Sequence, residues 1–420
     1  MCYKCYNRGL QIPDGCAAVI KTTEASAILL RVPPLGAEKK PLSEALGHAL
    51  AENIHADRDL PPAERSAMDG FAVRSADLIT PPRELKLAGE LAAGSAVRLD
   101  VTPGTCVRIM TGANIPQGAD TVVMVKKADD LGDRIRFSSK ASSGENIIHK
   151  AEDARRGELL LAQGALLGPL QMGVCAAVGK GKVIVYRRPR IALICTGEEL
   201  RDTDAAVEPH ELRNSNGPTL YAALTTMGFP VVGQKIVRDS LDELVAQLAI
   251  FSALADVIIL TGGVSKGKFD FVRAAVESIG ATIRFHGVAM KPGKPLLCAT
   301  LENNRFIFGL PGNPLAAMTG FYEFVVPTLR RLSGIQASEI KPSFFLATSS
   351  RITTKGGRTH FVLARLENGI SGLCVSPLAT RGSSDFVSGG RSDGAIVIPP
   401  EIREVEAGTI VEFHLWKPLF

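Results

Sequence analysis

A glycine-rich loop in the second half of the chain has the composition of an anion-binding site. The octet GGVSKGKF follows DVIIL, an apolar run typical of a buried strand. Gly262, Gly267 and Lys268 occupy three fixed positions of a phosphate-binding P-loop, but Phe269 stands where a Ser or Thr hydroxyl should hold magnesium. The loop is therefore interpreted as an anion site different from that of a nucleoside triphosphatase, in which Asp270 can serve a cation.

The loop KPGKP places two ammonium groups three residues apart, and a proline follows each lysine. Lys291 and Lys294 can hold fixed positive charge against an oxyanion at little ordering cost, because the prolines stiffen the loop. An ordinary surface turn is the alternative interpretation of this spacing.

The loop GLPGNP has the residues that begin a helix close to a ligand. Asn313 is a good N-cap, Pro314 is a good first helical residue, and Gly312 permits close backbone approach. The motif either directs a helix N-terminus toward an anion or only begins a helix well.

Acidic residues recur beside glycines and turns. Carboxylates near an anionic substrate make physical sense if they bind a divalent cation, accept hydrogen bonds or act as acid or base. Each one alone is more often a turn or cap residue. No His or Cys spacing indicates zinc, and no Ser-His-Asp arrangement is visible. The candidates are Asp69, Asp153, Glu199, Asp239 and Asp270.

The elements that must position these loops alternate between strand and helix across residues 190–334. This alternation indicates a doubly wound parallel sheet with helices on both faces. Ligands of such sheets bind beyond the carboxyl ends of the strands, where CTGEEL, GGVSKGKFD, KPGKP and GLPGNP are all expected to lie. The predicted strands are RIALICT, FPVVGQKIV, DVIIL and ATIRFHGVAM, and the predicted helices begin near Asn216, Ser240, Asp270 and Pro314.

On both sides of this α/β domain the sequence no longer alternates between strand and helix patterns. Short strands separated by Gly, Pro and Asp turns predict two β domains, one of them inserted into a discontinuous helical linker domain. The predicted divisions are an N-terminal extension expected to be disordered at 1–24, the linker domain at 25–57 and 154–186, the inserted β domain at 58–153, the α/β domain at 187–334 and the C-terminal β domain at 335–420.

The bulk composition describes a multidomain globular protein. The 420 residues are 45% hydrophobic and 22% charged, and 48 basic against 43 acidic residues give a net charge of only +5. This charge provides no general field for nucleic acid or a membrane surface. The apolar stretch at residues 159–179 has the length of a membrane span, but its Gln, Gly and Pro favour a turn followed by a short buried helix that begins at Pro169.

The cysteines favour a reducing cytoplasm. The later five of the eight are isolated in apolar stretches, as buried thiols are. Cys2 and Cys5 form a Cys-x-x-Cys pair, but a structural zinc site needs four ligands and only Cys16 is added nearby. A frayed tail is the preferred interpretation of this segment.

From about residue 25 onward the chain resembles the molybdopterin molybdenumtransferases, the molybdenum insertase family that also includes the C-terminal domain of gephyrin. Ordered motifs at matching spacing carry this resemblance. They are LPPAERSAMDGFAV, VRIMTGANIPQGADTVV, GENIIHKAED, IALICTGEEL, LRNSNGPTLYAAL, IILTGGVSKGKFDF, VAMKPGKPLL and GLPGNPLAAM.

The resemblance implies an elongated four-domain homodimer whose α/β domain holds adenylylated molybdopterin against the partner subunit. It also implies that molybdate enters the dithiolene and that AMP is released with Mg²⁺ present, as the last step of molybdenum cofactor synthesis. A separate molybdopterin adenylyltransferase is a possible partner. The other functions compatible with the residues are a gephyrin-like scaffold and pterin adenylyltransfer, and the retained acids and the flanking domains disfavour them.

Residue by residue, the resemblance assigns three groups of site residues. It implies catalytic roles for Asp69, Thr111, Asp153, Glu199, Asp239 and Asp270, with Mg²⁺ at Asp239 and Asp270. Substrate is expected at Gly262, Gly263, Ser265, Pro311, Gly312, Asn313 and Pro314, and molybdate at Lys291, Lys294, Arg358 and Ser383.

The chain departs from the family pattern at two places. Ala151 stands where a glycine usually precedes Glu-Asp, which puts the local turn around Asp153 in question. Lys266 and Lys268 add positive charge to a loop that is often neutral or acidic in the family. The extra lysines either tighten phosphate binding or are only solvated.

Overall fold

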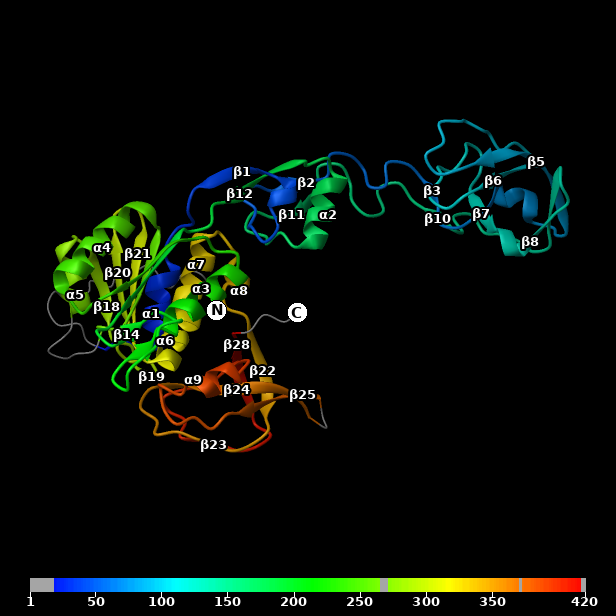
Figure 1. Ribbon diagram of the computed structural model, residues 1–420. Coiled ribbons are helices and arrows are strands. Elements are labelled where there is room, and N and C mark those ends of the chain that lie inside the picture. The colour runs from blue at the N-terminus through cyan, green and yellow to red at the C-terminus, as the bar shows by residue number, and fades with distance from the viewer. Residues whose placement is uncertain (1–18, 265–270, 370–371, 417–420) are drawn as a thin grey trace, which may run out of the picture.

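The computed structural model describes residues 19–264, 271–369 and 372–416. The chain is elongated, with an α/β domain and a C-terminal β domain at one end and an inserted β domain at the other (Figure 1). A narrow linker joins the two ends. Separate clusters of buried side chains form the cores of these parts.

The α/β domain is built on a six-stranded sheet with the order β16-β13-β17-β21-β20-β18. Alternate side chains of β13 enter two different cores: Ile191 and Leu193 pack on one face, and Ala192 and Ile194 on the other. The predicted doubly wound domain is thus confirmed. Its strands are β13 (Ile191–Thr196), β16 (Val231–Val237), β17 (Val257–Thr261), β18 (Thr282–His286), β20 (Leu297–Leu301) and β21 (Arg305–Leu310), and the short pair β14 (Leu200–Arg201) and β15 (Leu212–Arg213) lies beside the sheet.

The helices cover both faces of this sheet. The core on one face includes residues of α1 (Thr22–Leu30), α3 (Asn216–Thr226), α6 (Pro314–Gly320), the π-helix η4 (Phe321–Val325) and α7 (Val326–Leu332). The core on the other face includes residues of α4 (Leu241–Leu254) and α5 (Phe271–Ser278). The N-terminal helix α1 therefore packs with the α/β domain, although its residues from 25 onward were expected in the linker.

The sheet is mixed, whereas a parallel sheet was predicted, and β20 was not among the predicted strands. Strands β16, β13, β17 and β21 are parallel, but β20 is antiparallel to both β18 and β21. Between β18 and β20 the chain leaves this sheet and forms β19 (Met290–Lys291), which pairs with β24 (Thr359–Gly369) of the C-terminal domain. The KPGKP loop follows β18, the fourth strand of the sheet in chain order, as predicted, and it also lies at the junction of two domains.

The linker is mostly extended, in contrast to the predicted helical domain. The sequence LSEALGHALAENIH at residues 42–55 has helical composition, but Gly47 has φ +70° and interrupts it. The neighbouring strand β12 meets this segment at a bridge between Leu50 and Val185, so that backbone pairing replaces a helix. The elements are β1 (Ala37–Pro41), the 3-10 turn η1 (Leu42–Glu44), β2 (Ile54–His55), β11 (Leu159–Leu161), α2 (Pro169–Ala177) and β12 (Lys182–Tyr186).

The apolar stretch at 159–179 forms β11, a turn and α2, which begins at Pro169 as predicted. Only Cys175 of α2 is buried, so the helix lies more at the surface than expected. Among the described residues, no helix combines the length and apolar character needed to cross a membrane.

The inserted β domain has a six-stranded sheet with the order β7-β4-β6-β5-β9-β8. The pair β3 and β10 lies where the domain meets the linker (Figure 1). The elements are β3 (Arg65–Ser66), β4 (Gly70–Val73), η2 (Ser75–Leu78), β5 (Arg83–Leu91), β6 (Thr105–Ile109), β7 (Thr121–Met124), η3 (Val125–Lys127), β8 (Ala128–Asp130), β9 (Arg134–Phe137) and β10 (Ile147–Ile148).

The C-terminal β domain, also confirmed, continues from α8 and shares β19 with the preceding domain. Its six-stranded sheet has the order β19-β24-β25-β22-β28-β26, with an additional pairing of β24 and β26. The elements are α8 (Ala337–Ile340), β22 (Ser343–Thr348), β23 (Ile352–Thr353), β24, β25 (Gly372–Pro377), α9 (Phe386–Gly390), β26 (Gly394–Ile398), β27 (Glu404–Val405) and β28 (Ile410–Leu415).

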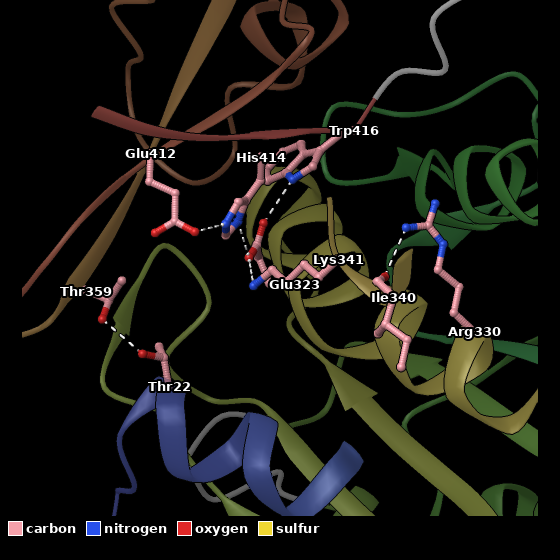
Figure 2. A network of polar contacts seen from close by, with 9 residues as sticks. All are labelled: Thr22, Glu323, Arg330, Ile340, Lys341, Thr359, Glu412, His414 and Trp416. Carbon is pink, nitrogen blue, oxygen red and sulfur yellow. Dashed lines mark hydrogen bonds and ion pairs between the residues drawn. The ribbon is translucent and has the colours of Figure 1, made fainter. Parts of the chain in front are cut away.

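A buried carboxylate fixes the C-terminal domain on the α/β domain (Figure 2). Glu323 of η4 is fully buried, and its Oε2 lies 2.6 Å from Lys341 Nζ and 2.8 Å from His414 Nδ1. Trp416 Nε1 donates to Glu323 Oε1 at 3.0 Å, and Glu412 Oε1 lies 3.0 Å from His414 Nε2. Because the partners come from the domain connection and from the end of β28, this network sets the orientation of the two domains that form the KPGKP junction.

Candidate active site

A cavity of about 690 Å³ lies at the carboxyl ends of the parallel strands of the α/β domain. Thr196 and Thr261, the last residues of β13 and β17, line it. This is the edge at which open α/β sheets bind ligands, because loops and helix N-termini converge there. The predicted site residues that line the cavity are Glu199, Asp239, Gly262, Gly263, Pro311, Gly312, Asn313 and Pro314.

Gly262 shows why the loop after β17 begins with glycine. Its φ is +93°, and a Cβ built on it would overlap the carbonyl oxygen of Thr196. No other residue fits without moving the neighbouring strand end. The two strand ends therefore approach closely and leave a backbone-lined floor to the cavity.

The following part of the GGVSKGKF loop lies outside the described residues. This applies to Ser265 and Asp270, which were predicted to bind substrate and cation, and to Lys266, Lys268 and Phe269. The N-terminal segment with Cys2, Cys5 and Cys16 also lies outside them.

Two acidic residues lie close together in this cavity. Burial raises the pKa of Asp239, and the negative charges of Glu199 and Glu198 raise it further. Converging carboxylates of this kind are disfavoured without a cation between them. The pair is thus suited to a divalent cation or to a proton held beside the substrate.

Magnesium fits this arrangement without an all-protein cage. Among the residues that the structure describes, no group of three or more His, Cys, Asp or Glu can hold a metal ion. Mg²⁺ is commonly bound by one or two carboxylates together with substrate phosphates. Asp239 and Glu199 supply such carboxylates in a cavity that a phosphate-bearing ligand would share.

Asparagines organise the loops on the opposite side of the cavity. Asn214 Oδ1 accepts from the backbone N–H of Gly217 at 3.0 Å, so Asn214 satisfies an N–H in the first turn of α3. Asn216 donates from Nδ2 to the carbonyl oxygen of Gly312 at 2.7 Å. The LRNSNGP motif is therefore tied directly to the GLPGNP motif.

Asn313 also differs from its predicted role. It occupies the N-cap position of α6, but its side chain makes no capping hydrogen bond. Its Nδ2 donates to Ser383 Oγ of the C-terminal domain at 2.8 Å. The side chain therefore joins two domains at the site rather than closing the helix end.

A second cavity, of about 510 Å³, lies between the KPGKP loop and the C-terminal β domain. Lys291, Lys294, Arg358 and Ser383 line it, so that all four residues predicted to bind molybdate are brought together. Among the described residues that line this cavity there is no Asp or Glu. Three cationic side chains without an acidic neighbour form a strongly electropositive pocket that is suited to an oxyanion.

The two cavities share a wall. Pro295, Pro311 and Asn313 line both of them. A ligand whose phosphates occupy the first cavity can therefore extend toward an oxyanion in the second. Spatial continuity of this kind is what a transfer between two bound reactants requires.

Asp69 and Thr111 form a well-ordered pair but lie far from both cavities. Asp69 Oδ1 accepts from the backbone N–H of Thr111 at 2.7 Å and from its hydroxyl at 2.9 Å. These two hydrogen bonds lower the pKa of Asp69. Asp69 precedes β4 and Thr111 follows β6, at the end of the molecule opposite the α/β domain (Figure 1). Within one chain, neither residue reaches the cleft.

Asp153 likewise lies outside the two cavities. It is exposed where the inserted domain joins the linker, and its backbone N–H donates to the carbonyl oxygen of Leu60 at 2.9 Å. Ala151, just before it, has φ +61°, a conformation that glycine adopts at lower cost. The turn forms despite the alanine, with Ala151 N–H donating to the Pro61 carbonyl oxygen at 3.0 Å.

Sequence reasoning missed several residues of the cavities. Asn214 and Asn216 belong to the LRNSNGP motif, and their amide side chains beside a helix start were the available signal. His360 lies in the electropositive cavity and is separated from Arg358 by one residue. An alternating pattern in GGRTHF would have placed both side chains on one face of a strand.

Family models cover the chain in three successive parts. Residues 20–179 match the MoeA N-terminal region (domain I and II), and residues 192–331 match a probable molybdopterin binding domain. Residues 346–416 match the MoeA C-terminal region (domain IV).

Two similar sequences carry the same protein name. The chain is 35% identical over 379 residues to the molybdopterin molybdenumtransferase of Staphylococcus aureus (strain COL), covering 89% of this chain and 90% of the relative. It is 34% identical to the protein of the same name from Staphylococcus epidermidis (strain ATCC 35984), over the same shares of the two chains.

Solved structures agree with this assignment. A molybdopterin biosynthesis MoeA protein from Pyrococcus horikoshii OT3 matches with a TM-score of 0.82 and 26% identity, over 95% of this chain and 100% of that chain. A second structure of a MoeA protein from Pyrococcus gives a TM-score of 0.78 and 28% identity, over 96% and 100%. By its sequence, its domain order and its fold, the chain belongs to the molybdopterin molybdenumtransferase family.

Proposed function

We propose that the protein inserts molybdate into adenylylated molybdopterin and releases AMP, the last step of molybdenum cofactor synthesis. The observation that supports this most is the pair of adjoining cavities. One is lined by glycine backbone and carboxylates, the other by three cations, and Pro295, Pro311 and Asn313 separate them. A phosphate-bearing pterin and an oxyanion fit these two environments, respectively.

The first cavity would hold the pterin nucleotide. Gly263 offers a backbone N–H at a turn, which is the usual way to bind phosphate oxygens. The N–H of Gly262 donates to the Leu310 carbonyl oxygen at 3.1 Å, so Gly262 contributes close backbone approach instead. Gly312 and Pro314 line the wall that faces them. The predicted contribution of Ser265 belongs to the same loop and remains a proposal from the sequence.

Magnesium would be held by Asp239 with Glu199, and by Asp270 according to the sequence. The ion would neutralise the charge of the phosphates when the adenylate is cleaved. The carboxylates themselves orient the phosphate end of the substrate and keep the cation at the cleft. Burial and the neighbouring charge of Glu199 raise the pKa of Asp239, and a bound cation would offset both effects.

The cationic cavity would bind molybdate through Lys291, Lys294, Arg358 and Ser383. Replacing Lys294 with alanine is expected to raise the molybdate concentration for half-maximal insertion by about ten- to a hundredfold, the loss of about 1.4 to 2.7 kcal/mol for charge-assisted contacts. Binding of the adenylylated pterin should change much less. Separate titrations of the two ligands measure this difference, and an equal loss for both would assign the lysine to the phosphates instead.

We also propose that the enzyme acts as a homodimer with a shared active site. Asp69, Thr111 and Asp153 lie outside the cleft of their own chain, and a partner subunit is the simplest means of supplying them. Mixed dimers that carry Asp69→Ala in one subunit and Asp239→Ala in the other should then regain about a quarter to a half of wild-type activity, because one of the two sites is intact. Failure to regain activity after verified subunit exchange would locate the whole site within one chain.

Reconstitution with purified components tests the proposed reaction. The protein, adenylylated molybdopterin, molybdate and Mg²⁺ should together release AMP, which is followed by chromatography. The same mixture with a chelator in place of Mg²⁺ serves as the control. Release no faster than in that control would remove the proposal.

A further inference from the structure

A buried histidine of the cationic cavity has an unused hydrogen-bonding atom. His360 is only 7% exposed, and it is the second residue of β24. Its Nε2 atom is buried and has no hydrogen-bond partner among the described residues. Leaving a buried polar atom unpaired costs free energy, so such an atom calls for a functional explanation.

The register of the sheet places this histidine among the residues of the oxyanion cavity. In the parallel pair of β19 and β24, His360 is the partner of Lys291. Register partners on neighbouring strands project from the same face of a sheet. Arg358 lies two residues before His360 along the chain, and all three residues line the same cavity.

The charged side chains around His360 all lower its pKa. Burial lowers its pKa, and the positive charges of Lys291 and Arg358 lower it further. On the other side of β24 its register partner is Ile398, which has no charge. Within the described parts of the chain, the only other ionisable group that lines the cavity is Lys294. At neutral pH the imidazole is therefore neutral and keeps a single N–H to donate.

We propose that His360 is a further ligand of the oxyanion and donates its Nε2–H to an oxygen of the bound anion. The inference rests on the oxyanion role proposed above for this cavity. It adds a neutral donor to three cationic side chains and explains why a buried imidazole nitrogen has been left without a partner in the described chain. A tetrahedral oxyanion such as molybdate presents several acceptor oxygens and can take this donor together with the cations.

Oxyanion binding by His360 and a packing role for His360 predict different effects of substitution. If Nε2 binds the oxyanion, removing it should lower the affinity for the oxyanion without lowering the stability of the protein. The reason is that the unpaired atom costs stability in the ligand-free protein. A histidine that serves only to fill space would show the reverse, with loss of stability and little change in affinity.

Two substitutions at His360 distinguish loss of the hydrogen-bond donor from a change in side-chain shape. His360→Leu removes the donor and keeps a similar volume, and His360→Gln keeps an N–H at about the distance of Nε2. Titration calorimetry of the full-length protein with sodium molybdate should show about tenfold weaker binding for His360→Leu and a change within about threefold for His360→Gln. The thermal unfolding midpoint of ligand-free His360→Leu should equal or exceed that of the wild type.

His48→Leu is a matched control in the linker. His48 is also buried, at 8% exposure, but its Nδ1 already lies 3.3 Å from the carbonyl oxygen of Tyr186. This variant should lower the unfolding midpoint and leave molybdate affinity unchanged.

Three results would overturn the inference. If His360→Leu binds molybdate with wild-type affinity, Nε2 does not contact the anion. If His360→Leu and His360→Gln weaken molybdate binding equally and both lower the thermal unfolding midpoint, the histidine serves packing. If Lys294→Ala also binds molybdate with wild-type affinity, the oxyanion site itself is elsewhere, and the failure then lies with the proposed function.

Discussion

Lys341→Met is expected to lower the free energy of unfolding by about 3 kcal/mol. Lys341 Nζ lies 2.6 Å from Glu323 Oε2, and the Glu323 side chain is fully buried (Figure 2). Removing one partner leaves a carboxylate in the interior with too little compensation, which typically costs about 3 to 5 kcal/mol. Urea unfolding of the wild type and the variant at pH 7 measures the difference.

The same substitution at a surface ion pair is the control. Lys127 and Glu145 are separated by 3.4 Å, but their side chains are 46% and 38% exposed. Lys127→Met should therefore change the free energy of unfolding by less than about 1 kcal/mol. Equal effects of the two substitutions would show that the buried network does not hold the C-terminal domain in place.

The pH dependence of this effect has a definite sign. Burial raises the pKa of Glu323, but the charge of Lys341 and the hydrogen bond with His414 outweigh burial and hold the pKa at about 2, against an ordinary value of 4.5. A lowered folded-state pKa contributes stability that is present above about 4.5 and lost as the pH falls toward 2. The difference between wild type and Lys341→Met should therefore shrink across this window, as measured by unfolding at each pH.

Asp239→Asn is expected to lower turnover by about a hundredfold or more while leaving the fold intact. The substitution removes the carboxylate whose charge, beside Glu199, makes the cleft suited to Mg²⁺, and loss of a group of this kind typically costs about 10² to 10⁴ in rate. The Mg²⁺ concentration for half-maximal AMP release should also rise. Steady-state kinetics at varied Mg²⁺, with circular dichroism to verify folding, measures both effects.

Asp242→Asn provides the comparison for this experiment. Asp242 is exposed in the first turn of α4 and does not line the cavity. It should retain turnover within about twofold of the wild type. Unchanged turnover of Asp239→Asn at limiting Mg²⁺ would contradict a role for this carboxylate at the cation.

The sequence predicted the site best where the residues belong to regular parallel strands. Apolar runs at β13 and β17 located the strand ends, so the pattern of residues alone placed Glu199 and Gly262 at the carboxyl edge of the sheet. The spacing of the paired lysines indicated an oxyanion site but left an ordinary surface turn open, and the family resemblance assigned molybdate to them.

Other features depend on contacts between distant segments and left little trace in the sequence. Strand β20 is short and apolar like its parallel neighbours, so its reversed direction could not be read from periodicity. The helical composition of residues 42–55 was overridden by pairing with β12 and by the positive φ of Gly47. The pairing of Lys291 with His360 is set by β19 and β24, which are about 70 residues apart and belong to different domains.

Under the proposed function, molybdenum insertion and adenylate cleavage are one coupled reaction in the two adjoining cavities. A single-turnover experiment measures both products together, with enzyme in excess over adenylylated molybdopterin. We expect one AMP to be released for each molybdenum incorporated. Both products should be lost when molybdate or Mg²⁺ is omitted, and both should form more slowly in Lys294→Ala. Release of AMP at the same rate without molybdate, or incorporation of molybdenum without AMP, would contradict this coupling.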